Sequence, residues 1–136
     1  MKATFILLFC CACMLLAENC RKPKDTSIAG GGKGGTSVLL VTPEHHGGFV
    51  DSCMIYIKYG TNDAPASGIY DDSARCVLSD TTPVATFSNL TVGLYYLYAI
   101  GYHLPYTPPN VKGGVPCTIQ NPGTQTIYLP TYSYQP

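Results

Sequence analysis

Apolar and polar side chains alternate along much of the chain after residue 36, as in strands that bury one face. The alternation is clearest in Asp51–Tyr59, where every second residue shares one face: Cys53, Ile55, Ile57 and Tyr59. In Gly93–His103 the positions Tyr95, Leu97 and Ala99 alternate with the flanking Leu, Tyr and Ile positions in the same way. Both segments therefore predict strands that lie over a hydrophobic core.

Shorter segments rich in β-branched and aromatic residues follow the same rule, and Gly, Pro and polar turns separate them. They are Ser37–Thr42, Arg75–Leu78, Pro83–Phe87, Val115–Ile119 and Thr124–Leu129. No window after the first 36 residues keeps a helical period. The pattern predicts an all-β domain over residues 37–132, a single seven-stranded Greek-key-type sandwich, followed by a short tail at 133–136.

The N-terminal segment has a different pattern. A basic start at Met1-Lys2 is followed by the apolar run Ala3–Ala17. Fifteen apolar residues are fewer than the roughly 20 that a transmembrane helix needs, and a short apolar run after a basic start is typical of a secretory signal. Residues 1–19 are therefore expected to be an export leader.

Cys20 follows this run and precedes a basic, polar stretch. The arrangement resembles the lipobox of bacterial lipoproteins, in which the cysteine becomes the first residue and carries acyl chains, although Ala17-Glu18-Asn19 departs from the usual small apolar residues. The resemblance implies palmitate-type acylation of Cys20 and a lipid anchor. Ordinary secretion with Cys20 as a plain thiol is the alternative. Residues 20–36, RKPKDTSIAGGGKGGT after the cysteine, predict a flexible tether.

Composition supports a strand-rich domain, and the charge balance reduces the classes of partner that we expect. The chain has 11 Tyr, 14 Gly and 11 Pro, and only 12% of its residues are charged. The eight basic and eight acidic residues give a formal net charge of zero. A neutral chain offers no electrostatic reason to bind nucleic acid. The membrane contact that we expect is the lipid anchor alone.

One motif points to a family. The residues Phe87, Leu90, Gly93, Tyr95 and Leu97 have the form F-x-x-L-x-x-G-x-Y-x-L. The motif resembles that of prealbumin-like (transthyretin-like) sandwich domains, including the carboxypeptidase regulatory type. Together with the leader and tether, the chain resembles small Bacteroidota lipoproteins. The resemblance implies an accessory module of the cell envelope at the outer membrane and supplies no catalytic residue. No acidic run, which would resemble a surface-export signal, follows Cys20, so the periplasmic side is favoured over the cell surface.

Three cysteines remain after the leader and Cys20: Cys53, Cys76 and Cys117. Exported proteins meet an oxidising compartment, so one disulfide and one thiol are expected. A Cys53–Cys76 bond would close a loop of about two dozen residues. On sequence alone a Cys76–Cys117 bond is equally possible, and all three cysteines could instead be small buried hydrophobes.

The histidines suggest a metal site. His45 and His46 follow the first strand, Asp51 begins the second, and His103 ends the Tyr-rich strand. If these strand ends meet at one pole of the sandwich, imidazole and carboxylate ligands suited to zinc or copper would gather there. Adjacent histidines are more often solvated turn residues, so no cofactor is assigned.

No hydrolase motif such as G-x-S-x-G or HExxH is present, and we do not expect an enzyme. Tyr56, Tyr96 and Tyr98 are predicted to point away from the core. Exposed tyrosines suit the binding of a protein or a glycan, but they also stabilise cross-strand pairs. The sequence therefore predicts a non-catalytic binding or scaffolding lipoprotein, with a metal-binding protein as the alternative.

Overall fold

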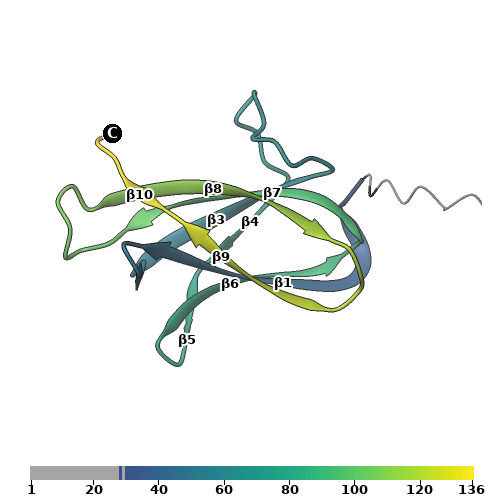
Figure 1. Cartoon of the computed structure of the whole chain (residues 1–136), viewed down its shortest axis with the longest axis horizontal. Coiled ribbons are helices and arrows are strands. Elements are labelled where there is room, and N and C mark those ends of the chain that lie inside the picture. The colour runs from purple at the N-terminus through teal and green to yellow at the C-terminus, as the bar shows by residue number, and fades with distance from the viewer. Residues whose placement is uncertain (1–27, 29) are drawn as a thin grey trace, which may run out of the picture.

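The computed structural model describes Ile28 and residues 30–136, so the expected leader and Cys20 lie outside the described residues. Within this part the regular elements are strands, with no helix among them. No helix long and apolar enough to cross a membrane is found there. The strands form two layers, labelled in Figure 1. The all-β prediction is thus confirmed.

The first layer, sheet A, contains the first strand of the domain at its centre. Its members are β1 (Lys33–His45), β2 (Gly48–Phe49), β5 (Val77–Ser79), β6 (Thr82–Leu90) and β9 (Thr124–Pro130). The order β2-β1-β6-β5 is antiparallel, and β9 pairs with β1 in parallel. β1 therefore joins segments from both ends of the domain.

The second layer, sheet B, is antiparallel throughout and has the order β10-β8-β7-β3-β4. Its members are β3 (Ser52–Tyr59), β4 (Asp72–Arg75), β7 (Gly93–Tyr102), β8 (Asn110–Ile119) and β10 (Tyr132–Ser133). In β3 and β7 the buried and half-buried residues alternate as the sequence predicts. Every second side chain of these strands therefore faces sheet A.

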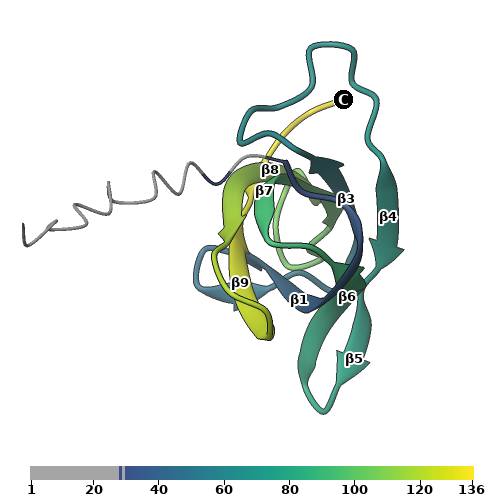
Figure 2. The ribbon, with the colours of Figure 1, turned by 90° about the vertical axis from the view of Figure 1, so that its right-hand side faces the viewer.

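The hydrophobic core lies between the two sheets, which Figure 2 shows from the side. Its largest fully buried side chains include Tyr95, Phe87, Leu39, Ile55 and Ile57. Burial of such side chains contributes about 1.5–3 kcal/mol each, before the entropy cost of folding. Packing of the core fixes the two sheets against one another, and so fixes where their outer faces lie.

The observed strands differ from the prediction in number. Ten strands are present in the described part, and the segment predicted as one strand at Arg75–Leu78 is divided at Cys76. β4 ends at Arg75 in sheet B and β5 begins at Val77 in sheet A. The chain thus changes sheet at a single residue, a step that local strand propensity does not indicate. β2 and β10, of two residues each, were also not predicted.

Both boundaries of the predicted domain need correction. β1 begins at Lys33, so residues 33–36 belong to the sheet and not to the tether. At the other end β10 pairs with β8, and the backbone N–H of Tyr134 donates to Asn110 O at 2.9 Å. Half of the predicted tail, Ser133 and Tyr134, is therefore paired with the domain.

Candidate functional site

The motif residues meet where β6 leads into β7. Tyr95 is fully buried, and its hydroxyl donates to Thr91 O at 2.6 Å. The hydroxyl oxygen of Tyr95 also accepts a hydrogen bond from the backbone N–H of Gly32 at 2.9 Å. Phe87, Leu90 and Leu97 are buried around this corner. Tyr95 thus ties the β6–β7 turn to the chain that enters β1, which makes the motif a structural device rather than a binding site.

The motif glycine, Gly93, lies where two segments of the chain cross. Its φ of 158° is close to extended backbone. A Cβ at this position would collide with the backbone of Gly30 and Gly31, which crosses directly over it. Gly93 is therefore needed for close approach between two chain segments.

Two of the predicted histidines come together at one pole. His45, at the end of β1, and His103, just after β7, are both buried, and their Nδ1 atoms lie 3.1 Å apart. His45 Nε2 lies 3.1 Å from the Ser133 hydroxyl on β10. The Tyr106 ring packs against both imidazoles, at centroid distances of 4.7 and 4.6 Å. One proton is shared between the two Nδ1 atoms, so one ring donates and the other accepts.

The other predicted ligands do not join this pair. His46 is exposed in the β1–β2 turn and stacks on Tyr106. Asp51 accepts a hydrogen bond from the backbone N–H of Leu104 at 3.2 Å. In the described residues no group of three or more His, Cys, Asp or Glu side chains is arranged to hold a metal ion. The four residues share a pole of the domain, but only two ligand nitrogens converge.

The histidine pair gives a pH prediction. Burial lowers the pKa of His45, and positive charge on His46 and His103 lowers it further. The folded state therefore disfavours protonated His45, whose unfolded pKa is about 6.5. We expect the free energy of unfolding to be highest above about pH 6.5 and to fall as the pH drops through the lowered pKa. Urea unfolding between pH 4 and 8 measures this slope.

The control for this prediction is the His45→Gln variant, which lacks the titrating group. Its stability should depend less on pH below 6.5 than that of the native protein. His46→Asn, in the exposed turn, should keep most of the native slope, since Asn tolerates the φ of 51° found there. An unchanged slope in His45→Gln would contradict the assignment.

The outer face of sheet B carries a cluster of aromatic side chains, which we call the tyrosine face. It comprises Tyr56, Tyr70, Tyr96, Tyr98, Tyr132 and Tyr134. The Tyr70 and Tyr98 rings are nearly parallel, with centroids 5.7 Å apart, and Tyr56 lies 5.6 Å from Tyr70. Lys112 Nζ sits 4.5 Å from the centroid of Tyr134. The rings thus form a broad aromatic surface.

Tyr70 was not predicted, because it comes from the polar loop between β3 and β4. Asp71 and Asp72 fix the end of this loop: Lys58 Nζ lies 2.8 Å from Asp71, and Lys33 Nζ lies 3.0 Å from Asp72. Hydrogen bonds from these lysines lower the pKa of both carboxyl groups. The loop is therefore anchored on each side of the sheet edge, and Tyr70 is held against Tyr98.

The hydroxyls of Tyr70 and Tyr98 remain protonated at neutral pH. Burial raises the pKa of Tyr70 and of Tyr98, and neighbouring tyrosines raise both further. Each hydroxyl can therefore donate and accept a hydrogen bond beside an apolar ring. This combination suits a ligand that has both C–H surface and hydroxyl or amide groups.

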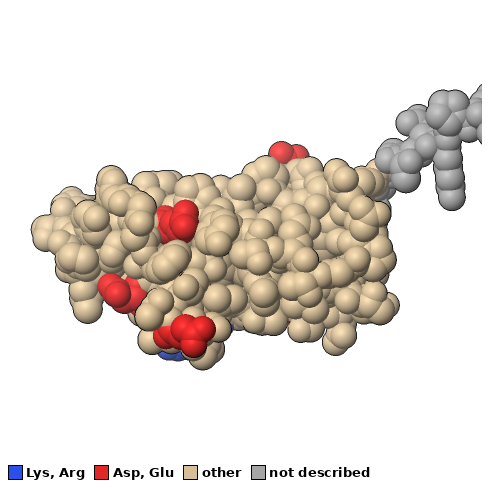
Figure 3. Space-filling view, turned by 60° about the horizontal axis from the view of Figure 1, so that its bottom comes forward, with Lys and Arg blue, Asp and Glu red and all other residues tan. Residues whose placement is uncertain are grey.

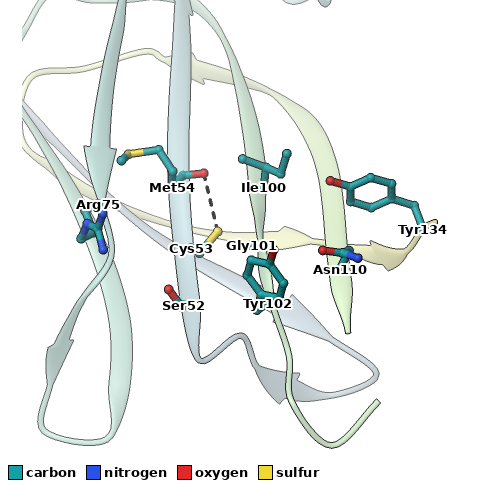
Figure 4. A pocket seen from close by; sticks show the side chains of 9 residues that line it. All are labelled: Ser52, Cys53, Met54, Arg75, Ile100, Gly101, Tyr102, Asn110 and Tyr134. Atoms are coloured by element: carbon teal, nitrogen blue, oxygen red, sulfur yellow. Dashed lines mark hydrogen bonds between the residues drawn. The ribbon is translucent and has the colours of Figure 1, made fainter. Parts of the chain in front are cut away.

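Two hollows border the tyrosine face. One, of about 280 Å³, lies over the end of sheet B and is shown in Figure 4. Its lining includes Met54, Arg75, Ile100, Tyr102 and Tyr134. The other, of about 430 Å³, lies beside Tyr56 and Tyr70 and is lined also by Gly68, Asp71, Asp72 and Ser73. Aromatic rings and polar groups thus line both ends of the same surface.

Charged side chains are sparse on the side of the molecule formed by sheet A (Figure 3). Figure 3 shows a face of the molecule that is largely uncharged, with scattered acidic side chains and few basic ones. Comparison with protein-family models, with curated proteins and with solved structures found no match to this chain. The tyrosine face is therefore the main candidate for a binding surface on this chain.

Proposed function

We propose that this chain is a non-catalytic lipoprotein of the cell envelope, anchored through acylated Cys20, which binds its partner through the tyrosine face. The anchor would hold the domain on the periplasmic side of the outer membrane. The observation that carries the binding role is the cluster of six tyrosines on one outer sheet face. Aromatic residues are enriched in the core of protein interfaces.

The strand order supports a prealbumin-like, Greek-key sandwich as the scaffold. In chain order β3 is followed by β4, which pairs with it, and then by β6 in the opposite sheet after the change of sheet at Cys76. β7 then returns to pair with β3. If β4 and β5 are taken as one strand that changes sheet at Cys76, this strand pairs with β3 through β4 and with β6 through β5. The order β7, β3, β4–β5, β6 then corresponds to the 4-1-2-3 arrangement of a Greek key.

The chemistry of the face favours a neutral glycan of the envelope as the partner. Flat tyrosine rings can cover the C–H faces of sugar rings, while their hydroxyls exchange hydrogen bonds with sugar hydroxyls. The nearby acids Asp71 and Asp72 are already paired with lysines, so they add little net charge. Two basic side chains on this side of sheet B, Arg75 and Lys112, belong to neither of these ion pairs, so the face carries a small positive charge beside six aromatic rings.

Two variants separate anchoring from binding. Cys20→Ala should abolish the incorporation of labelled palmitate and leave glycan binding intact. Tyr98→Ser should keep the label and weaken binding about tenfold or more, since losing an aromatic anchor costs about 1.4 kcal/mol or more. Affinity electrophoresis through a panel of neutral polysaccharides measures binding, and metabolic labelling measures acylation.

Tyr128→Ser is the matched control, because Tyr128 is an exposed tyrosine on β9 of the other sheet. Its retardation in the gel should equal that of the native protein. If no neutral polysaccharide retards the native protein, or if Tyr128→Ser and Tyr98→Ser weaken binding equally, the binding proposal is wrong. Palmitate labelling that persists in Cys20→Ala would show that Cys20 is not the acylated residue.

A further inference from the structure

Cys53 and Cys76 lie opposite one another at the end of the β3–β4 ladder. Met54 pairs with Arg75, so the next pair along the ladder is Cys53 with Cys76. The backbone N–H of Cys76 donates to Cys53 O at 2.9 Å. Directly opposed residues in antiparallel strands have Cα atoms about 4.5–5.5 Å apart, within the range of disulfides. The backbone already holds the two residues at bonding separation.

Both side chains also point to the same side of the sheet. Cys53 is buried in the core, and Cys76 is half-buried and packs against it. The Cys53 thiol donates to Met54 O at 3.6 Å, and interaction between the two neighbouring thiols raises the pKa of Cys53 and lowers that of Cys76. All three cysteines of the described part are thiols in the structure. We propose that Cys53 and Cys76 form a disulfide in the exported protein and that Cys117 remains a thiol.

The sheet register excludes Cys117 as the partner. Cys53 pairs with Gly101 on β7, and Gly101 pairs with Val111 on β8. Cys117 lies six residues further along β8, which corresponds to about 20 Å at roughly 3.4 Å per residue. Cα atoms more than about 7 Å apart cannot be bridged without backbone movement. Cys76 lies opposite Cys53 on the far side of β3 from β8, so register also excludes the Cys76–Cys117 pairing that the sequence left open.

The reaction requires an oxidant, which we take to be the disulfide of an envelope dithiol–disulfide exchange protein. The half-buried Cys76 loses its proton and attacks that disulfide, which forms a mixed disulfide and releases one thiolate of the oxidant. Cys53 then loses its proton and attacks the Cys76 sulfur, and the second sulfur of the oxidant leaves as a thiolate. Two electrons and two protons pass to the oxidant, which ends as a dithiol.

The bond would clamp the point where the chain leaves sheet B for sheet A. It would close the loop that carries Tyr70, and it would fix Arg75 beside the hollow that Cys53 also lines. Closing a loop of about two dozen residues removes conformations from the unfolded chain. The disulfide would therefore stabilise both the sheet edge and the tyrosine face. This inference rests on export, which is part of the proposed function.

The test uses the full chain isolated from its cells and the same protein exposed to oxidised glutathione after reduction. We expect a peptide linking Cys53 to Cys76, a mass lower by about 2 Da, and Cys117 alkylated after unfolding. Reduction should lower Tm by more than about 10 °C. Cys117→Ser should keep the linked peptide, whereas Cys76→Ser should lose it.

The intact mass also reports whether the leader has been cleaved. A processed protein in which Cys53 and Cys76 are both alkylated without reduction overturns the inference, as does a bond to Cys117. An unprocessed protein overturns the proposed export, and the glutathione reaction then decides the disulfide by itself. Failure to form the linked peptide with glutathione overturns the pairing.

Discussion

Replacing Tyr95 by Ala is expected to lower the free energy of unfolding by about 3–5 kcal/mol. The ring is fully buried in the core, so its loss removes apolar burial and leaves a cavity. Its hydroxyl also joins Thr91, at the β6–β7 turn, to Gly32, just before β1. Urea denaturation followed by circular dichroism measures the change.

Tyr95→Phe separates the ring from the hydroxyl. It keeps the packing and removes the hydrogen bonds, and it leaves the backbone groups of Gly32 without that partner. We expect a loss of about 1–3 kcal/mol. Tyr102→Phe is the control, because Tyr102 is 53% exposed. The free energy of unfolding of this variant should stay within about 0.5 kcal/mol of that of the native protein. Equal stability of Tyr95→Phe and the native protein would show that the corner does not depend on the hydroxyl.

The alternation of side chains was sufficient to predict the two central strands of sheet B. In β3 and β7 the residues assigned to the core face are those that the structure buries, apart from half-buried Tyr59. Local pattern works here because a strand with one buried face must repeat every two residues. The outward direction of Tyr56, Tyr96 and Tyr98 follows from the same rule, so much of the tyrosine face was visible in the sequence.

What the sequence could not provide were contacts between distant segments. Tyr70 reaches the tyrosine face because Asp71 and Asp72 anchor its loop to lysines of β3 and β1. The pairing of His45 with His103 depends on which strand ends meet at one pole. Strand pairing also decides between Cys76 and Cys117. Composition and period carry no information about such long-range registers.

The Gly-rich segment shows a different limit. Gly30–Gly35 resembles a flexible linker in composition, yet two of its glycines, Gly31 and Gly35, lie where backbone crosses backbone. A Cβ on Gly31 would collide with Leu94 O, and one on Gly35 with Leu90 O. Glycine is present in flexible linkers because it lacks a side chain, and it permits close approach for the same reason. Composition alone does not distinguish the two uses.

Gly35→Ala is therefore expected to destabilise the domain by about 3 kcal/mol, at the upper end of the usual cost of overpacking. The added methyl group would meet Leu90 O and the backbone of Thr91, which cannot rotate away as a side chain can. The expected result is a lower midpoint of urea denaturation with an unchanged slope. If residues 30–36 were instead a free tether, the substitution would have almost no effect.

Gly32→Ala is the matched control, three residues away in the same Gly-rich segment. A Cβ there meets only the Tyr59 ring, at an ordinary contact distance of 3.9 Å. Its stability should stay within about 0.5 kcal/mol of native. A large loss in Gly35→Ala with little change in Gly32→Ala would place the start of the folded domain at β1, because only a segment fixed against the sheet can distinguish the two positions. Equal losses of stability in the two variants would show that the segment belongs to the tether and not to the folded domain.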